Sequence, residues 1–238
     1  MMQEQQNKLL IPIAIIIAGG LIGWGIIATN KNTNPGKETP TTPLSQEETT
    51  NKAISVWNTD YILGNPDAKL MFISFSDFEC PFCAIFHQTM HQIINEYGKD
   101  GQVAWIFRQF PIYGATAEKK ALAVRCAGEL GGNAKFWELS DEIFQTKPNE
   151  EKQLVEIANS IGLDEKQFLK CLDNDTIIDM VKKEYQSGIN TGVLGTPTSQ
   201  GGTPYTVILT KFGKTYPISG AQPFSVIKSI IDLILQEN

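Results

Sequence analysis

The fold is decided by the stretch KLMFISFSDFECPFCAIFHQTMHQIINEYG, residues 69–98. It begins with a short apolar run over 69–75, which predicts a buried strand. Over 81–97 the apolar side chains recur at helical spacing, which predicts a helix that a glycine ends. Cys80 and Cys83 therefore lie where a strand turns into a helix.

The first cysteine lies beside the start of the predicted helix. Pro81 suits the first helical turn, because the N–H that proline lacks would have no partner there. The free N–H groups of the helix start and the helix dipole favour a thiolate at Cys80 over a thiol. A low-pKa, accessible cysteine with a second cysteine in reach is what thiol–disulfide exchange requires.

The composition is that of a globular protein. The chain has 238 residues, of which 42% are hydrophobic, and about 190 of them are enough for one domain with a sizeable core. The net charge of −6 gives no indication of nucleic-acid binding.

An apolar segment precedes the domain. Residues 9–28 carry no charge and are long enough for one membrane span, so we expect a retained transmembrane anchor. A cleaved signal peptide is the alternative, but 27–29 is a poor cleavage site. We expect 1–8 to be a short cytoplasmic N-terminus, 29–52 a disordered linker, and 53–238 the folded domain.

The charges that flank this segment do not support the orientation that we expect. Lys8 precedes the segment, whereas Lys31 and Lys37 follow it. The even number of cysteines behind an apolar segment suits an oxidising compartment. We therefore expect a single-pass protein of the cell membrane with the domain on the extracytoplasmic side.

The rest of the domain alternates strands with a block of helices. We expect an α/β fold in which a helical insertion, at about 115–188, separates two sheet-forming halves. The further strands are expected at 54–57, 102–110, 205–210 and 215–219, and the further helices at 115–130, 136–144, 154–161, 164–172, 177–185 and 223–235.

The chain resembles the thioredoxin superfamily, and within it the DsbA-like thiol–disulfide oxidoreductases, including the membrane-anchored BdbD-like group. The resemblance runs from about residue 54 to the C-terminus. It implies a thioredoxin fold with an inserted all-helical domain. The residues that carry it are Phe75 to Cys83, Ile62 to Pro66, Arg108 to Pro111, Phe136-Trp137, Thr203-Pro204 and Gly220 to Pro223.

The resemblance also implies roles for four residues. Cys80 resembles the exposed nucleophile that forms a mixed disulfide with a client, and Cys83 the buried resolving cysteine. A Thr–Pro pair resembles the cis-proline loop that faces the disulfide and binds client backbone. Thr203-Pro204 is favoured, because it leads straight into the strand at 205–210. Thr196-Pro197 is the alternative. Residues 199–202 would then lie between this pair and the strand, and we do not expect them to form a strand.

Two positions depart from the family pattern. Many members have a buried acid six residues before the first cysteine, where this chain has Ser74. The strongest oxidants of the family carry Pro-His between the cysteines, where this chain has Pro81-Phe82. We expect a site that is less oxidising than a Pro-His version.

The other two cysteines lie on predicted helices of the insertion. Cys126 and Cys171 could be two buried free thiols. Some family members carry a second, structural disulfide between two helices of this block. We expect that bridge here.

A zinc site is the competing interpretation of the cysteine pair. Cys83, His87 and His91 recur every four residues, on one face of the predicted helix. One helix cannot surround a tetrahedral ion with Cys80 and these three residues, so we expect no metal. The two histidines are expected on the helix surface.

Together these features predict a membrane-anchored oxidoreductase that introduces disulfide bonds into extracytoplasmic proteins. We expect no organic cofactor, a monomer, cysteine-containing secreted or membrane proteins as clients, and re-oxidation by a membrane quinone-linked thiol oxidase of the DsbB or VKOR kind, as the resemblance implies. A disulfide reductase or isomerase of the same fold is the alternative. A further alternative is a non-catalytic redox-sensing or client-binding module, although such a module would not need both cysteines.

Overall fold

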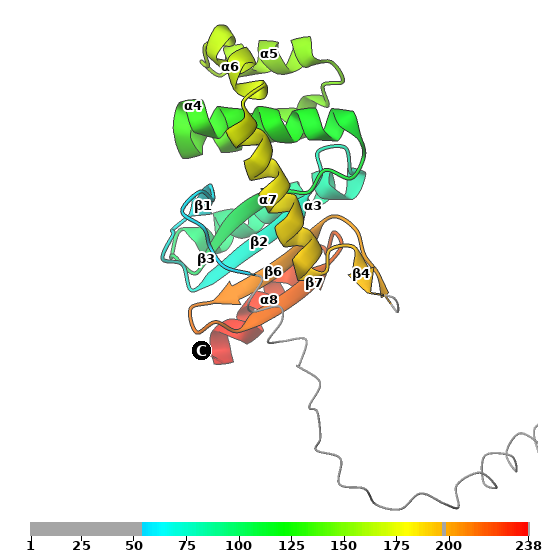
Figure 1. Ribbon diagram of the computed structural model, residues 1–238. Helices are drawn as coiled ribbons and strands as arrows, with labels where there is room; N and C mark the ends of the chain where they lie inside the picture. Colours follow the sequence, from blue (N-terminus) through cyan, green and yellow to red (C-terminus); the bar gives the residue numbers. More distant parts are fainter. Residues whose placement is uncertain (1–53, 197–198, 238) are drawn as a thin grey trace, which may run out of the picture. The chain divides into compact units, whose positions relative to one another are not determined.

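The computed structural model describes residues 54–196 and 199–237, which are coloured in Figure 1. The expected anchor at 9–28, its flanking segments and Pro197 lie outside these residues. Within the part that is described, no helix is both long and apolar enough to cross a membrane.

A five-stranded sheet forms the centre of the molecule, with strand order β1-β3-β2-β6-β7. Its middle strands, β2 and β3, are parallel, and the other neighbours pair antiparallel. Both middle strands are buried along their whole length, which explains why their sequences are continuous apolar runs. The strands are β1 Ile62–Gly64, β2 Leu70–Ser76, β3 Val103–Gln109, β6 Tyr205–Thr210 and β7 Thr215–Ser219, and a separate pair is β4 Gly195–Thr196 with β5 Ser199–Gln200.

Helices cover the sheet and form the insertion between β3 and β6. The active-site helix α3 and the C-terminal helix α8 pack against each other, and α7 returns from the insertion to lie against β3 (Figure 1). The helices are α3 Pro81–Ile93, the π-helical turn η1 Ile94–Gly98, α4 Ala115–Thr146, α5 Glu151–Ser160, α6 Glu165–Leu172, α7 Asp175–Thr191 and α8 Phe224–Glu237. The expected α/β architecture with a helical insertion is confirmed.

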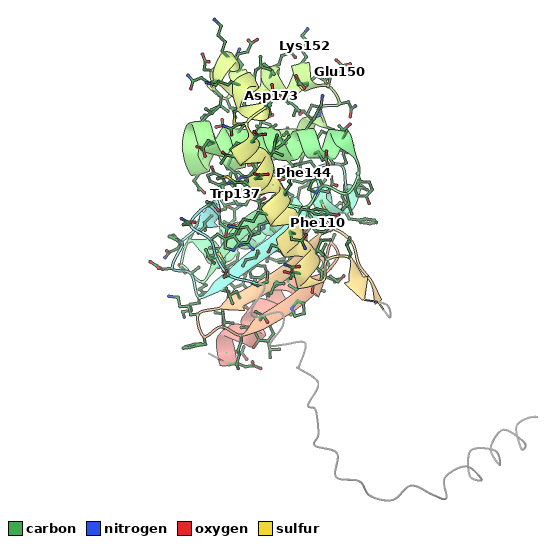
Figure 2. The ribbon with its side chains drawn as sticks, in the orientation of Figure 1. Phe110, Trp137, Phe144, Glu150, Lys152 and Asp173 are labelled. Carbon is green, nitrogen blue, oxygen red and sulfur yellow. A yellow bond between two sulfur atoms is a disulfide. The ribbon has the colours of Figure 1, made fainter. Side chains whose placement is uncertain are left out.

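The core has two parts, because successive side chains of a strand point to opposite faces of the sheet. Phe72 and Trp105 point to the face covered by α3 and α8, where the core continues into the insertion. Met71 and Ile106 point to the other face. Figure 2 shows Trp137 and Phe144 on the inner side of the insertion. Charged side chains such as Glu150, Lys152 and Asp173 lie at its outer end.

One expected strand is absent, and three short strands of the structure, β1, β4 and β5, were not expected. Residues 54–57 form no strand. The Arg108 guanidinium instead lies over the Trp57 ring, with its carbon 3.6 Å from the ring centroid, and the backbone N–H of Trp57 donates to Asp60. Ser199–Gln200, which we did not expect to form a strand, is β5, since its backbone pairs with β4.

The first helix of the insertion ends at its two glycines, as the sequence predicts. Two glycines predict a stop after 130, and α4, although it spans Ala115–Thr146, has non-helical backbone at Gly132. Gly132 has a positive φ of 74°, so the backbone bends there and helical geometry resumes. The single span therefore contains the two helices that the sequence predicts at 115–130 and 136–144.

Candidate active site

Cys80 and Cys83 lie at the start of α3. Cys80 is the N-cap, with extended backbone, and Pro81 occupies the first turn. The Cys80 carbonyl accepts hydrogen bonds from the N–H groups of Cys83 and Ala84, at 3.1 and 3.3 Å. The two cysteine side chains therefore lie one helical turn apart, both as free thiols.

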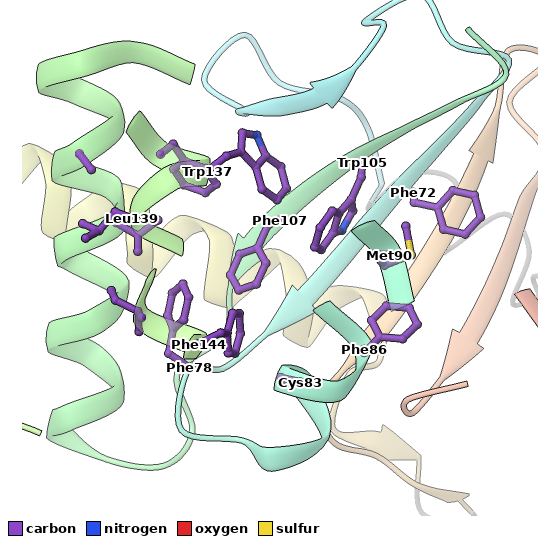
Figure 3. Close-up of a cluster of buried hydrophobic side chains, with 14 of the residues drawn as sticks. Phe72, Phe78, Cys83, Phe86, Met90, Trp105, Phe107, Trp137, Leu139 and Phe144 are labelled. Atoms are coloured by element: carbon purple, nitrogen blue, oxygen red, sulfur yellow. The ribbon is translucent and has the colours of Figure 1, made fainter. Parts of the chain in front are cut away.

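Both cysteines are about 1% exposed. The resemblance implied an exposed Cys80, so this expectation was wrong for the molecule without a client. Phe82, between them, is 60% exposed. Figure 3 shows Cys83 at the edge of the buried aromatic cluster, beside Phe86.

The electrostatics of the two thiols are opposite. A hydrogen bond from the Cys83 thiol lowers the pKa of Cys80 to about 5, against the effect of burial. The Thr203 side chain and the N–H groups of Cys83 and Phe82 add to the lowering. Burial raises the pKa of Cys83 far above its usual range, and its hydrogen bond to Cys80 raises it further. Cys80 is therefore the thiolate at neutral pH and Cys83 the thiol.

A cis peptide bond joins Thr203 to Pro204. The Cys80 sulfur lies 3.3 Å from the Thr203 carbonyl oxygen. Pro204 is buried and leads directly into β6. The structure thus brings together the four residues favoured from sequence, whereas the alternative Pro197 lies outside the described residues.

Asp77 is a structural residue of the turn before Cys80. Its buried carboxylate accepts from three backbone N–H groups, those of Glu79 at 2.7 Å, Ile112 at 2.6 Å and Tyr113 at 3.0 Å. Its own N–H donates to the Cys83 sulfur at 3.4 Å. The sequence could not show in which direction this carboxylate points.

Ser74 occupies the position where many family members have an acid. Its hydroxyl hydrogen-bonds with the Thr206 hydroxyl at 2.9 Å and accepts from the Trp105 indole at 3.0 Å. This chain therefore has a neutral, hydrogen-bonded group at that position.

Lys120 is a functional candidate that sequence reasoning missed. Its side chain is buried in the first half of α4 and forms an ion pair with Glu79, the residue before Cys80. A lysine in an alanine-rich helix gives no signal of burial. The pair joins the insertion to the turn that carries the cysteines.

Apolar side chains are exposed around the thiols. Phe82 and Ile85 extend from α3, and Ile112 and Tyr113 from the loop after β3, with exposed fractions from 38% to 60%. The negative charge of Cys80 raises the pKa of Tyr113, so this ring lies close to the thiolate. These four side chains form an exposed apolar rim beside the sulfur.

The remaining two cysteines form a disulfide. Cys126 of α4 and Cys171 of α6 are bonded, with Cα atoms 5.7 Å apart. The bond joins two helices of the insertion, as the resemblance implied, and lies among buried apolar side chains.

The histidines of α3 are not both surface residues. His87 is 5% exposed and packs against the rings of Trp105 and Phe144, so that expectation was wrong. His87 and His91 both contact the Asp141 carboxylate of α4, at 2.6 and 2.8 Å. Burial lowers the pKa of His87, and the hydrogen bond to Asp141 opposes this. Burial tends to raise the pKa of Asp141, but the hydrogen bonds from both histidines lower it to about 2.

Comparison with known proteins agrees with this geometry. The thioredoxin family model matches residues 57–199. The probable disulfide bond formation protein D of Bacillus anthracis is 26% identical over 209 residues, which cover 82% of this chain and 88% of that protein.

The chain also matches part of larger proteins. It is 26% identical to the Na⁺/H⁺ antiporter NhaA of Herminiimonas arsenicoxydans over 179 residues. These residues cover 75% of this chain and 27% of that protein. It thus spans about a quarter of that relative's length.

The fold agrees with solved structures. The alpha-DsbA1 structure from Wolbachia pipientis superposes with a TM-score of 0.66 at 21% identity, covering 79% of this chain and 96% of that one. With a thioredoxin family model over most of its described residues, a cysteine pair at a helix start and a cis-proline facing it, the chain belongs to the thioredoxin family and has the DsbA-like form of that fold.

Proposed function

We propose that the chain is a membrane-anchored thiol–disulfide oxidoreductase that introduces disulfide bonds into extracytoplasmic proteins through Cys80 and Cys83. One observation carries the proposal. A thiol with a pKa of about 5 lies at the start of α3, next to a second, buried thiol and 3.3 Å from the backbone of the cis-proline loop.

The reaction starts from a disulfide between Cys80 and Cys83. A client thiolate attacks the Cys80 sulfur, the Cys80–Cys83 bond breaks, and Cys83 takes the electron pair and a proton. A second client thiolate then attacks the client sulfur of the mixed disulfide, and Cys80 leaves as a thiolate. The client loses two electrons and two protons in forming its disulfide. Cys80 and Cys83 gain the two electrons, Cys83 takes one proton, and the other proton goes to solvent because Cys80 remains a thiolate.

The low pKa of Cys80 favours this direction. A thiol with a low pKa is a good leaving group in the second step. The ionised Cys80 thiolate also stabilises the reduced form of the protein, and this makes the disulfide form a stronger oxidant. The exposed Phe82 and Tyr113 give the client an apolar surface beside the sulfur.

The cycle needs an oxidant, and we assign that role to a membrane quinone-linked thiol oxidase of the DsbB or VKOR kind. An anchor at 9–28 would hold the domain near such a partner on the extracytoplasmic face. The similarity to a probable disulfide bond formation protein supports the oxidising direction of the reaction. We expect the protein to act as a monomer and without an organic cofactor.

A trapping experiment tests the proposal. In the Cys83→Ser variant, the mixed disulfide at Cys80 cannot be resolved from within the protein, so clients should accumulate on it in cells. Mass spectrometry should identify secreted or membrane-exposed proteins with cysteines. The Cys80→Ser/Cys83→Ser double variant is the control and should trap none.

Two outcomes would oppose the proposal. Trapped partners that are all cytosolic would overturn the localisation, and no trapped partner at all would overturn the exchange activity.

Equilibration of the purified protein with glutathione then gives the reduction potential. A value more reducing than that of the glutathione pool would indicate a reductase.

A further inference from the structure

We propose that His87, His91 and Asp141 form a binding site for a divalent transition-metal ion, and that Zn²⁺ is the ion that it fits best. The His87 Nε2 and Asp141 Oδ1 atoms are 2.6 Å apart, and the His91 Nε2 atom lies 2.8 Å from the same oxygen. The two Nε2 atoms are 3.1 Å apart. Three metal-ligating atoms thus converge on one point.

The dimensions suit zinc. A point about 2.1 Å from all three atoms lies about 1.3 Å outside their plane, and this is the usual zinc bond length to nitrogen and oxygen. Neighbouring ligand atoms in a tetrahedral zinc site are about 3.3 Å apart, so side-chain shifts of a few tenths of an ångström complete the geometry.

The local sequence explains the convergence. His87 and His91 are four residues apart in α3 and therefore share one face of that helix. Asp141 comes from the second half of α4, which packs over the same face. Two imidazoles and one carboxylate with an open fourth position are a common ligand set for zinc.

The surroundings hold the ligands in place. The His87 ring is enclosed by Trp105, Phe107 and Phe144, and its Nδ1 atom has no partner among the described residues. Its polar contacts therefore lie at Nε2, on the side of Asp141. The two Nε2 atoms and the Asp141 Oδ1 atom all carry lone pairs and repel one another. Without a cation, only hydrogen bonds through protons shared between them offset this repulsion.

An ion can reach the site from solvent. The side chains of His91 and Asp141 are 33% and 47% exposed, and with His87 they line a cavity of about 830 Å³. A water molecule in this cavity would supply the fourth ligand. Gln88 and Gln145 line it with neutral polar groups, and Lys147 with a cationic one.

The site lies between the active-site helix and the helical insertion. His87 follows Cys83 by one turn of α3, and Asp141 belongs to the helical insertion. A bound ion would link the active-site helix directly to the insertion through metal–ligand bonds. The ligand set differs from the Cys83-containing one that the sequence suggested, because Asp141 is 50 residues away from His91.

Calorimetric titration of Zn²⁺ into the full chain tests this site. The protein is freed of any affinity tag, treated with chelator and oxidised, so that all four cysteines are in disulfides and none can bind zinc. We expect one equivalent of Zn²⁺ to bind with a Kd below about 10 μM. The chain has two histidines, so both belong to the site.

Three variants locate the binding. Asp141→Asn and His91→Gln should each weaken zinc binding by at least about tenfold. Glu138→Gln is the matched control, since Glu138 is an exposed carboxylate of the same helix, and it should change the Kd by less than about twofold. All three positions are partly exposed, and circular dichroism checks that each variant is folded.

A Co²⁺ spectrum gives a second readout. Tetrahedral Co²⁺ should show visible absorption bands without thiolate charge transfer, and Asp141→Asn should abolish them. Zinc binding weaker than about 100 μM, or binding that Asp141→Asn and His91→Gln leave unchanged, would overturn the site and leave a cluster held together by shared protons.

Discussion

The thiol of Cys80 should titrate near pH 5 in the reduced protein, and removal of the Cys83 thiol should raise that value. The hydrogen bond from Cys83 is the largest cause of the lowered pKa. Cys83→Ala removes it completely, whereas Cys83→Ser keeps a hydroxyl donor in its place. The pKa of Cys80 should therefore rise most in the alanine variant.

The magnitude follows from the thiolate fraction. With a pKa of about 5, about 99% of Cys80 is thiolate at pH 7, against about 1% for a thiol at the ordinary value of 9.0. A thiolate of lower pKa is also a weaker nucleophile, by about 60-fold over this interval at a Brønsted coefficient of about 0.45. The two effects nearly cancel at pH 7, so a rate at neutral pH is a poor test.

The difference appears in acid. At pH 5 about half of Cys80 is still thiolate, against about 0.01% of an ordinary thiol. After the loss of nucleophilicity, Cys80 should still react about 80 times faster than an ordinary thiol at this pH. The pH profile, rather than the rate, therefore distinguishes the two.

Alkylation by iodoacetamide measures that profile. The peptide that contains Cys80 is quantified by mass spectrometry after timed reaction at about pH 4 to about pH 9, with Cys80→Ser as the background. Wild type should show half-maximal rate near pH 5 and a plateau above about pH 6. A midpoint at pH 8, or an identical midpoint in Cys83→Ala, would refute the reasoning.

The same pKa predicts how stability depends on pH. The folded pKa of Cys80 lies below its unfolded value, so the thiolate stabilises the reduced fold fully above about pH 9, and this contribution is lost as pH falls through about 5. The oxidised form has no such titration. The free energy of unfolding of the reduced form, relative to the oxidised form, should therefore be larger at pH 8 than at pH 5 in urea titrations. An equal difference at both pH values would contradict this.

Three further substitutions test other parts of the structure. Replacing Cys126 and Cys171 by alanine opens a loop with a sequence separation of 45 and should lower the free energy of unfolding by about 4 kcal/mol, measured in urea; a loss below about 1 kcal/mol would contradict the structural role. Asp60→Asn leaves the buried Arg108 guanidinium without its carboxylate, 2.8 Å away, and should cost about 3–5 kcal/mol, and an unchanged urea midpoint would oppose this. Phe82→His places an imidazole beside the nucleophilic thiol and should raise the reduction potential in glutathione equilibration, so a potential no higher than that of wild type would count against it.

Local patterns predicted the strand, turn and helix around the cysteines. In this stretch the pattern of apolar residues and the turn signals depend on neighbouring residues only. The structure has β2 and α3 where the sequence places them. Pro204 could be preferred for a similar reason, since it directly precedes a recognisable strand.

Features that depend on distant partners could not be predicted in this way. His87 and His91 form a polar face on α3, which normally indicates exposure, but Asp141 of the insertion covers that face. Trp57 has a strand-forming side chain but packs under Arg108, so its segment is not available for pairing. Lys120 is buried because Glu79 lies opposite, 41 residues away.

The carboxylate of Asp77 has a consequence for engineering the domain. It fastens the turn before Cys80 to the loop at Ile112 and Tyr113, the loop from which the helical insertion starts. An insertion exchanged between relatives at the end of β3 would take this loop with it, and the new loop would then have to present two backbone N–H groups to the same carboxylate. A transplantable unit therefore has to include both the redox turn and that loop.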